Sequence, residues 1–298
     1  MQNKFKTNMK RWTNLFFLIT LIVTLVSCST KDPNEQINKE LSAIDQYLKA
    51  NNTDPVVTDV NQTRIVIKSF GNDAPPHTGQ TVHVSYTAST FPAGSTFDIG
   101  SLDEKLENIT IPGLQSGITS ILKGTHAVLY IPSKYAFGSA GTALVPANTT
   151  VVYDINLESV DRATAEQTQF QADTAAIHNY IKNQENNIQG AIMLPSGVWY
   201  TVQAEGSGTQ PKPYDLVSMN YTGKILSNGS QFTTGSLTAQ NVFSFIDGLK
   251  LGLPQMKEGG KATFYIPSGY GYGTTGNGSV GANQNLIFEI ELNAVNHN

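Results

Sequence analysis

The strongest constraint on the fold is an internal duplication. Aromatic residues, glycines and prolines of one block recur 135 positions further along this 298-residue chain. The pairs include Tyr86 with Tyr221, Phe97 with Phe232, Gly113 with Gly248, Pro132 with Pro267, and Tyr153 with Phe288. A constant offset over a whole block indicates duplication of a domain, because solenoid repeats have periods of about 20 to 50 residues. A unit of about 100 residues can bury a core of its own. The sequence therefore predicts two copies of one fold.

The N-terminus has the layout of an export signal. Four basic residues precede an apolar run over residues 15–26, and this run is too short for a comfortable membrane span. We therefore expect residues 1–27 to be a signal peptide. The segment Leu25-Val26-Ser27-Cys28 resembles the bacterial lipobox, in which the cysteine is lipidated and becomes the first residue of the mature chain. An ordinary signal peptide with a chance cysteine, or an uncleaved anchor, is the alternative.

Charge and cysteine content limit the kinds of binding partner and of covalent cross-link that the chain can have. Cys28 is the single cysteine, so no disulfide within the chain can support either domain. Without residues 1–27 the chain has 15 Lys and Arg against 23 Asp and Glu, a net charge of −8. This balance argues against nucleic acid and against an electrostatic hold on anionic lipid. Membrane attachment would then depend on the acyl chains. Ser29 after the lipidated cysteine is usual for outer-membrane lipoproteins of Gram-negative bacteria, and the leaflet stays open.

Each copy begins with a helical lead-in. Apolar residues recur at helical spacing at Ile37, Leu41, Ile44 and Leu48, and again at Phe170, Ile177, Tyr180 and Ile181. We expect each helix to pack on its own domain, with pairing of the two helices or docking to a partner chain as alternatives. The predicted organisation is a signal peptide over 1–27, a lipid tether and lead-in over 28–55, a first domain over 56–161, a helical linker over 162–190 and a second domain over 191–298.

Strand and helix patterns within each copy predict an α+β fold. Residues 151–158 and 286–293 alternate apolar and polar side chains, which indicates strands with one buried face, and Tyr153 and Phe288 point inward. One short helix interrupts the strands of each copy. Its apolar stripe is Leu114, Ile118, Ile121 and Leu122 in the first copy, and Leu249, Leu253 and Met256 in the second. Pro254 lies inside the second stripe and should remove a hydrogen bond or kink the turn.

Several motifs in this order resemble the FKBP-type peptidyl-prolyl cis/trans isomerases. The second copy has Asn220-Tyr221-Thr222-Gly223, Phe232, Ile246-Asp247-Gly248-Leu249 and Tyr270-Gly271-Tyr272-Gly273. The first copy has Ser85-Tyr86-Thr87, Thr96-Phe97-Asp98, Ile111-Pro112-Gly113-Leu114 and Tyr135-Ala136-Phe137-Gly138. The resemblance covers roughly residues 64–160 and 197–295. It implies two tandem domains, each an antiparallel half-barrel sheet wrapped on the short helix, with a proline-binding pocket between sheet and helix.

The resemblance also implies the site residues. In the first pocket the catalytic set is Tyr86, Phe97, Asp98, Phe137 and Tyr153, and Ile111, Leu114 and Val145 contact the substrate. In the second pocket the lining residues are Tyr221, Phe232, Thr233, Ile246, Leu249, Tyr272, Val280 and Phe288. Three departures from the family pattern stand out. Leu114 and Leu249 replace the usual Trp, Phe137 replaces a hydroxyl-bearing Tyr, and Thr233 replaces the Asp.

The chemistry of X-Pro isomerisation needs no nucleophile, metal or cofactor. Its obstacle is amide resonance, with a barrier of about 18–20 kcal/mol, and a dry aromatic slot can favour the twisted amide. The five histidines have no metal-ligand spacing, so we expect no metal and no cofactor. Gly271, Gly273 and Gly276 fit a dinucleotide-binding pattern, but the residues after them cannot open a helix, which favours a glycine-rich loop.

The function that follows is a folding catalyst of the bacterial cell envelope, a peptidyl-prolyl isomerase acting on proline-containing segments of envelope or surface proteins. It would be exported and lipid-anchored, and would not bind nucleic acid. The alternative is a non-catalytic binding, chaperone or scaffold lipoprotein that recognises the same segments. The incomplete pockets favour this alternative, whereas the retained aromatic residues favour catalysis.

Replacing the predicted lipidation site tests the anchor. We expect Cys28→Ala to release the protein from the membrane fraction, because the rest of the mature chain is not apolar enough to span. Cell fractionation followed by immunoblotting measures the distribution. A processed Cys28→Ala species that still sediments with membranes would contradict lipid attachment at this residue.

Overall fold

The computed structural model describes residues 34–186 and 188–297. The predicted signal peptide and Cys28 lie outside these residues. The first part of the described chain has α2 (Glu35–Asn51), β1 (Val56–Thr58), β2 (Arg64–Ser69), β3 (Thr81–Thr90), β4 (Thr96–Lys105), α3 (Pro112–Thr119), β5 (His126–Ile131) and β6 (Val151–Asp161). The second part has α4 (Thr164–Lys182), β7 (Ile192–Met193), β8 (Trp199–Ala204), β9 (Leu216–Ile225), β10 (Gln231–Asn241), α5 (Asp247–Gly252), β11 (Lys261–Ile266) and β12 (Leu286–Asn296). Within the described residues, no helix is long and apolar enough to cross a membrane.

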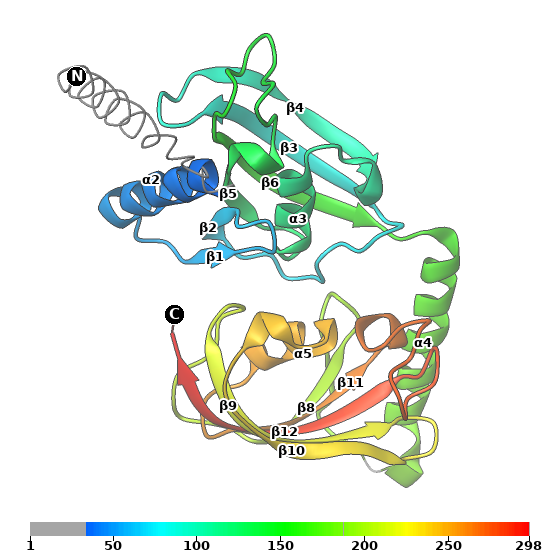
Figure 1. Cartoon of the computed structure of the whole chain (residues 1–298). Coiled ribbons are helices and arrows are strands. Elements are labelled where there is room, and N and C mark those ends of the chain that lie inside the picture. The colour runs from blue at the N-terminus through cyan, green and yellow to red at the C-terminus, as the bar shows by residue number, and fades with distance from the viewer. Residues whose placement is uncertain (1–33, 187, 298) are drawn as a thin grey trace, which may run out of the picture. The chain divides into compact units, whose positions relative to one another are not determined.

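Two antiparallel sheets of six strands have the same topology. Their strand orders are β1-β2-β5-β6-β3-β4 and β7-β8-β11-β12-β9-β10. The registers also match, because Tyr153 pairs with Ala88 and Leu129, and Phe288 pairs with Gly223 and Phe264. In the second domain, the curved sheet wraps around α5 (Figure 1). The predicted α+β fold of two duplicated half-barrel domains is confirmed.

The short helix of each copy lies very close to its sheet. A Cβ atom built on Gly113 would lie 2.3 Å from Ile131 Cγ2, and one built on Gly248 would lie 2.3 Å from Ile266 Cγ2. These distances are well inside van der Waals contact, so glycine is what lets the first turn of each helix reach the sheet. The same constraint in both copies sets the position of the next residue, Leu114 or Leu249.

Both short helices end earlier than their apolar stripes suggest. α3 ends at Thr119, so Ile121 and Leu122 follow the helix, although both are buried. α5 ends at Gly252 and continues as the 3₁₀ turn η5 (Leu253–Gln255), with Pro254 inside it. The prediction of one helix reaching Met256 was wrong, because proline cannot donate the hydrogen bond that continues an α-helix and its ring clashes with the preceding turn.

Each lead-in helix contacts its own domain through a buried carboxylate. Glu40 of α2 accepts hydrogen bonds of 2.6 Å from the backbone N–H and the hydroxyl of Ser133. Asp173 of α4 accepts equivalent bonds of 2.9 Å and 2.5 Å from Ser268. Apolar residues pack beside these bonds, Ile44 and Leu48 against Val66 in one copy, and Ile177 and Ile181 against Tyr265 and Ile287 in the other.

The strand pattern was correct except where a helix covers the outer face. β6 alternates buried and exposed side chains as expected, whereas Ile287 of β12 is buried on the face opposite to Phe288. α4 supplies that cover through Ile177 and Ile181. An apolar residue on the expected solvent face of a strand therefore marks the docking position of a helix.

The glycine contact yields a stability prediction. We expect Gly113→Ala to lower the free energy of unfolding by about 1–3 kcal/mol, because the added methyl overpacks the α3 to β5 contact. Gly269→Ala is the control, since a Cβ there has no atom within 4 Å. Urea unfolding of both variants measures the difference. An unchanged midpoint for Gly113→Ala would show that Ile131 and the helix yield without cost.

Candidate active sites

Four aromatic rings form the walls of a slot in the first domain. β3, β4 and β6 supply Tyr86, Phe97 and Tyr153, and Phe137 follows the 3₁₀ turn η2 (Ser133–Tyr135). Phe97 meets Phe137 edge to face at 5.9 Å between ring centroids, and meets Tyr153 in the same way at 6.2 Å. Tyr86 lies 5.6 Å from Tyr153. Edge-to-face packing holds such rings in fixed orientations.

Leu114 of α3 closes the floor of this slot. The resulting cavity of about 490 Å³ is lined by the predicted residues Tyr86, Phe97, Asp98, Ile111, Leu114, Phe137 and Tyr153. Val145 is not among its lining residues; this side chain is 1% exposed and lies in the core. Sequence reasoning missed Leu102, Ile109 and Thr110, which also line the cavity. Leu102 and Phe97 are the half-buried residues of the otherwise exposed strand β4, and no period-2 pattern marks them.

One polar pair lies at the edge of the aromatic walls. The Tyr86 hydroxyl donates a hydrogen bond of 2.7 Å to Asp98 Oδ2. Burial, and then this bond, raise the pKa of Tyr86 to about 12. Burial also raises the pKa of Tyr153. Both hydroxyls are therefore neutral at pH 7, and the slot combines aromatic walls with the carboxylate of Asp98, which the Tyr86 hydroxyl holds, and the carboxylate of Glu104.

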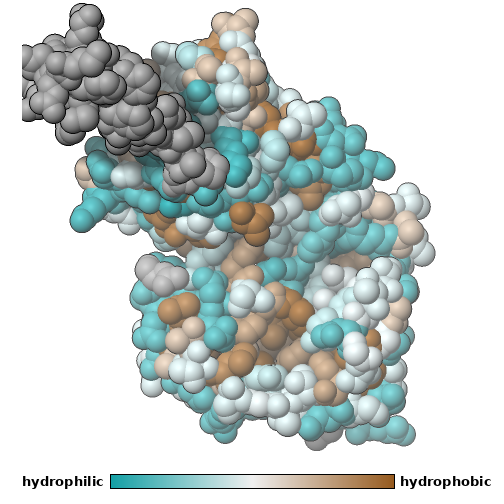
Figure 2. Space-filling view, in the orientation of Figure 1, coloured by the Kyte–Doolittle hydropathy of each residue, from teal (hydrophilic) through white to brown (hydrophobic). Residues whose placement is uncertain are grey.

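The second domain repeats the slot with different polar groups. Phe232 meets Tyr272 edge to face at 6.0 Å and Phe288 at 5.7 Å. Tyr221, Ile246 and Tyr272 pack against the buried residues Leu249, Val280 and Phe288. Thr233 holds the place of Asp98, so Tyr221 has no carboxylate at that position, whereas Tyr272 keeps a hydroxyl where Phe137 has none. Apolar surface gathers in the hollow of this domain around α5 (Figure 2).

A cavity of about 910 Å³ continues from the rim of the second slot. Ile246 and Tyr272 belong to both, and α4, the turn η6 (Ser268–Tyr270) and residues 77–79 supply the other walls. Sequence reasoning identified the lead-in helix and the motif around Tyr270 but did not place them at a common cavity. The walls come from segments that are distant in sequence, so neither periodicity nor the family motif shows that they meet.

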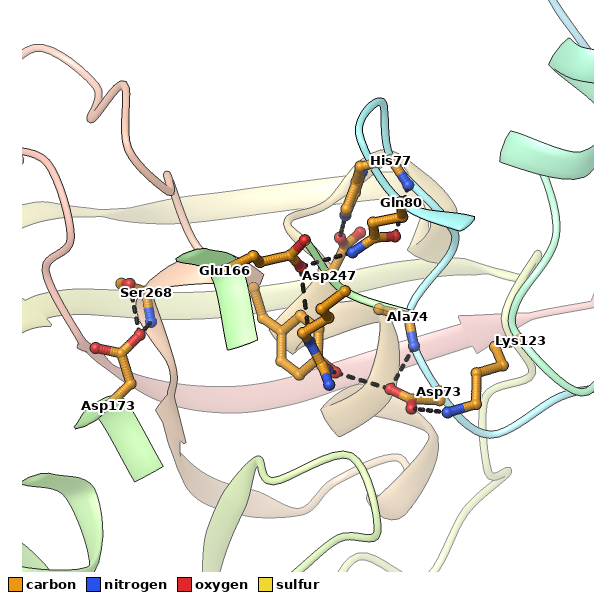
Figure 3. A network of polar contacts seen from close by, with 11 residues as sticks. Asp73, Ala74, His77, Gln80, Lys123, Glu166, Asp173, Asp247 and Ser268 are labelled. Carbon is orange, nitrogen blue, oxygen red and sulfur yellow. Dashed lines mark hydrogen bonds and ion pairs between the residues drawn. The ribbon is translucent and has the colours of Figure 1, made fainter. Parts of the chain in front are cut away.

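A polar network holds the walls of this cavity in place (Figure 3). His77 Nε2 and Lys250 Nζ each lie 2.7 Å from a different oxygen of Asp247, the residue after Ile246. Gln80 donates a bond of 2.6 Å to Glu166 of α4. The hydroxyl of Tyr270, the tyrosine at the end of η6, donates a bond of 2.9 Å to Asp73. The network therefore joins α4, α5 and η6 to the loop that precedes β3.

The pair of His77 and Asp247, 2.7 Å apart, lies beside the second slot. The hydrogen bond to Asp247 raises the pKa of His77 above its ordinary value against the effect of burial. Burial opposes ionisation of Asp247, but the bond from His77 and the charge of Lys250 outweigh it and lower the pKa of Asp247. Within the described residues, no group of three His, Cys, Asp or Glu side chains is arranged to hold a metal ion.

This pair predicts a pH-dependent contribution to stability. The raised His77 pKa means that the contribution is complete below the ordinary histidine pKa of about 6.5 and is lost as the pH rises through the raised value. The lowered Asp247 pKa means that the stabilising contribution of the pair is also lost at acidic pH, as the pH falls below the ordinary aspartate pKa of about 3.9 and through the lowered value. His77 is 49% exposed, so we expect at most about 1 kcal/mol.

The test compares His77→Gln with the parent chain in urea. The difference in unfolding free energy should be larger at about pH 5.5 than at about pH 8.5, because glutamine cannot acquire the charge. His178→Gln is the control, since this exposed histidine lies beside the ring of Trp199, at 6.0 Å between ring centroids. A His77→Gln difference that is the same at both pH values would contradict the charge pairing of His77 with Asp247.

Comparison with known proteins identifies the class. A model of the FKBP-type peptidyl-prolyl cis-trans isomerase family matches residues 72–158 and 207–293, more than half of the chain. The chain belongs to this family, and both matched segments contain one aromatic slot.

Three similar proteins each match less than half of the chain. An FKBP-type peptidyl-prolyl cis-trans isomerase FkpA from Aeromonas hydrophila is 33% identical over 148 residues, which are 47% of this chain and 55% of that protein. FK506-binding protein 1 from Gibberella zeae is 38% identical over 109 residues, 33% of this chain and 98% of that protein. The crystal structure of FkpA from Escherichia coli is 27% identical with a TM-score of 0.38, covering 45% of this chain and 63% of that one. The chain thus spans about half the length of the Aeromonas relative.

Proposed function

We propose that the chain is a peptidyl-prolyl cis/trans isomerase of the bacterial cell envelope that acts on proline-containing segments of envelope or surface proteins. The observation that carries the proposal is the first slot, where Tyr86, Phe97, Phe137 and Tyr153 surround a floor made by Leu114, and Asp98 is held at the edge. Membership of the isomerase family supports it. Export and attachment through Cys28 complete the proposal and rest on the lipobox resemblance.

The mechanism follows from the contents of the slot. A pyrrolidine ring fits among the aromatic rings, and its removal from water favours the twisted amide, whose resonance and dipole are smaller than those of the planar forms. Asp98 and the Tyr86 hydroxyl lie where they can orient the substrate backbone. A ten-thousandfold acceleration needs about 5.4 kcal/mol in total, which such contacts can supply without covalent chemistry.

The two slots differ in the groups that they can offer. The first slot has Asp98 but lacks the hydroxyl at position 137, and a neutral hydrogen bond is worth about 0.5–1.5 kcal/mol, or roughly tenfold at most. The second slot has the hydroxyl of Tyr272 but lacks the carboxylate. We therefore propose that the first slot is the more active. These same deficits favour the second candidate function, a protein that binds proline segments without useful catalysis.

Matched variants of the full chain assign the activity. We expect Phe97→Ala or Asp98→Ala to remove most isomerisation of an X-Pro peptide, Phe232→Ala to remove less, and Phe137→Tyr to raise kcat/KM several-fold. A protease-free isomerisation assay measures each rate, and circular dichroism controls for folding.

The results of this assay distinguish the two candidate functions and the two slots. Loss of activity in Phe232→Ala but not in Phe97→Ala would reverse the assignment of the two slots. Absence of turnover in the parent chain, with proline-peptide binding that Phe97→Ala abolishes, would favour the binding function instead.

A further inference from the structure

The second slot adjoins a cavity whose lining includes residues of the lead-in helix α4. The cavity of about 910 Å³ shares Ile246 and Tyr272 with the second slot, and its outer walls are α4, η6 and residues 77–79. The lining of the first slot includes no residue of α2, although α2 and α4 are equivalent lead-in helices. The lead-in helix therefore lines a cavity beside the second slot, but it does not line the first slot.

We propose that this cavity binds the polypeptide residues that flank the proline held in the second slot. The second domain would then recognise an extended segment, whereas the first recognises little beyond the X-Pro pair. The proposal rests on the proposed function and adds a subsite to it: the cavity lined by α4, η6 and residues 77–79 would hold residues that flank the proline.

Continuity and size support this occupant. Ile246 and Tyr272 line the cavity and also pack against the apolar cluster that contains Leu249 and Phe288, so the cavity adjoins the second slot. Its volume lies at the upper end of the roughly 300–1,000 Å³ of binding pockets for drug-sized ligands. A space of this size accommodates several residues of an extended chain.

The charges of the walls favour a neutral chain over a small anion. Asp247 is paired with His77 and Lys250, and Glu166 with Gln80 and Arg162. The lining has three carboxylates, Glu166, Asp173 and Asp247, against Arg162, Lys250 and His77, so it has no excess of positive charge, and Arg162 also lies over the ring of Phe170. Paired carboxylates still have lone pairs that accept hydrogen bonds from backbone amides, while they repel phosphate or carboxylate ligands.

Partial filling of the cavity tests the proposal. Ala165 is exposed on α4 and lines the cavity, so Ala165→Trp should fill it from the helix side. Gly269→Trp fills it from η6, where a Cβ has no atom within 4 Å and folding should be unaffected. Ala175→Trp is the matched control, because Ala175 is exposed on α4 but does not line the cavity.

The assay uses the full chain with Phe97→Ala to silence the first slot. It measures kcat/KM and Kd for a tetrapeptide and for a longer peptide with the same X-Pro centre. We expect the parent to favour the longer peptide. Both cavity-filling variants should lower that preference several-fold while their turnover of the tetrapeptide is unchanged. The Ala175→Trp control should keep the preference of the parent.

Failure of this inference and failure of the proposed function are distinguishable. Equal length preference in all variants would overturn the subsite while leaving isomerase activity intact. Absence of turnover for both peptides would overturn catalysis by the second slot, and the Kd values would then test the subsite. Tighter binding of the longer peptide that Ala165→Trp and Gly269→Trp both remove would support the subsite. Any other pattern of Kd values would contradict it.

Discussion

The close contact between the short helix and the sheet is the constraint on which each domain depends. Gly113 and Gly248 allow the first helical turn to approach Ile131 and Ile266 at a distance that no side chain would permit. This approach places Leu114 and Leu249 under the aromatic rings and leaves a slot between helix and sheet. A helix held farther away by a methyl group would leave a wider and wetter gap, in which a proline ring would lose contact with at least one wall.

Duplication made most of this arrangement predictable from the sequence. One constant offset aligned strands, glycines and aromatic residues at once, and the structure brings seven residues named from the family resemblance together in the lining of one cavity. Most of what the sequence did not indicate depends on contacts across the fold. Val145 is an apolar residue at a motif position, but the loop directs it into the core, and Leu102 reaches the slot from a strand without alternation. Pro254 ended its helix sooner than an apolar stripe could indicate.

The lead-in helices show how two equivalent elements can come to differ. Glu40 and Asp173 make the same buried bonds to Ser133 and Ser268, so each helix belongs structurally to its own copy. Only α4 also contributes to a polar network with the loop before β3, through Glu166 and Gln80. Sequence patterns identified both helices but could not distinguish these environments, because the partners come from distant segments.

The polar groups of the two slots suggest a division of labour. Loss of one hydroxyl at Phe137 costs less than loss of a charged group that orients the substrate, since bonds to charged groups are worth about 1.5–3 kcal/mol. The first slot can therefore retain chemistry on short X-Pro segments with Asp98 in place. The second slot lacks that carboxylate but adjoins a larger cavity. Substrate residues that flank the proline could therefore contribute binding energy there. Such binding energy raises kcat only if the contacts are stronger when the amide is twisted. Contacts that are equally strong with the planar amide only bind the client chain more tightly. A tandem arrangement in which one copy holds and the other isomerises requires only that both copies reach the same unfolded chain.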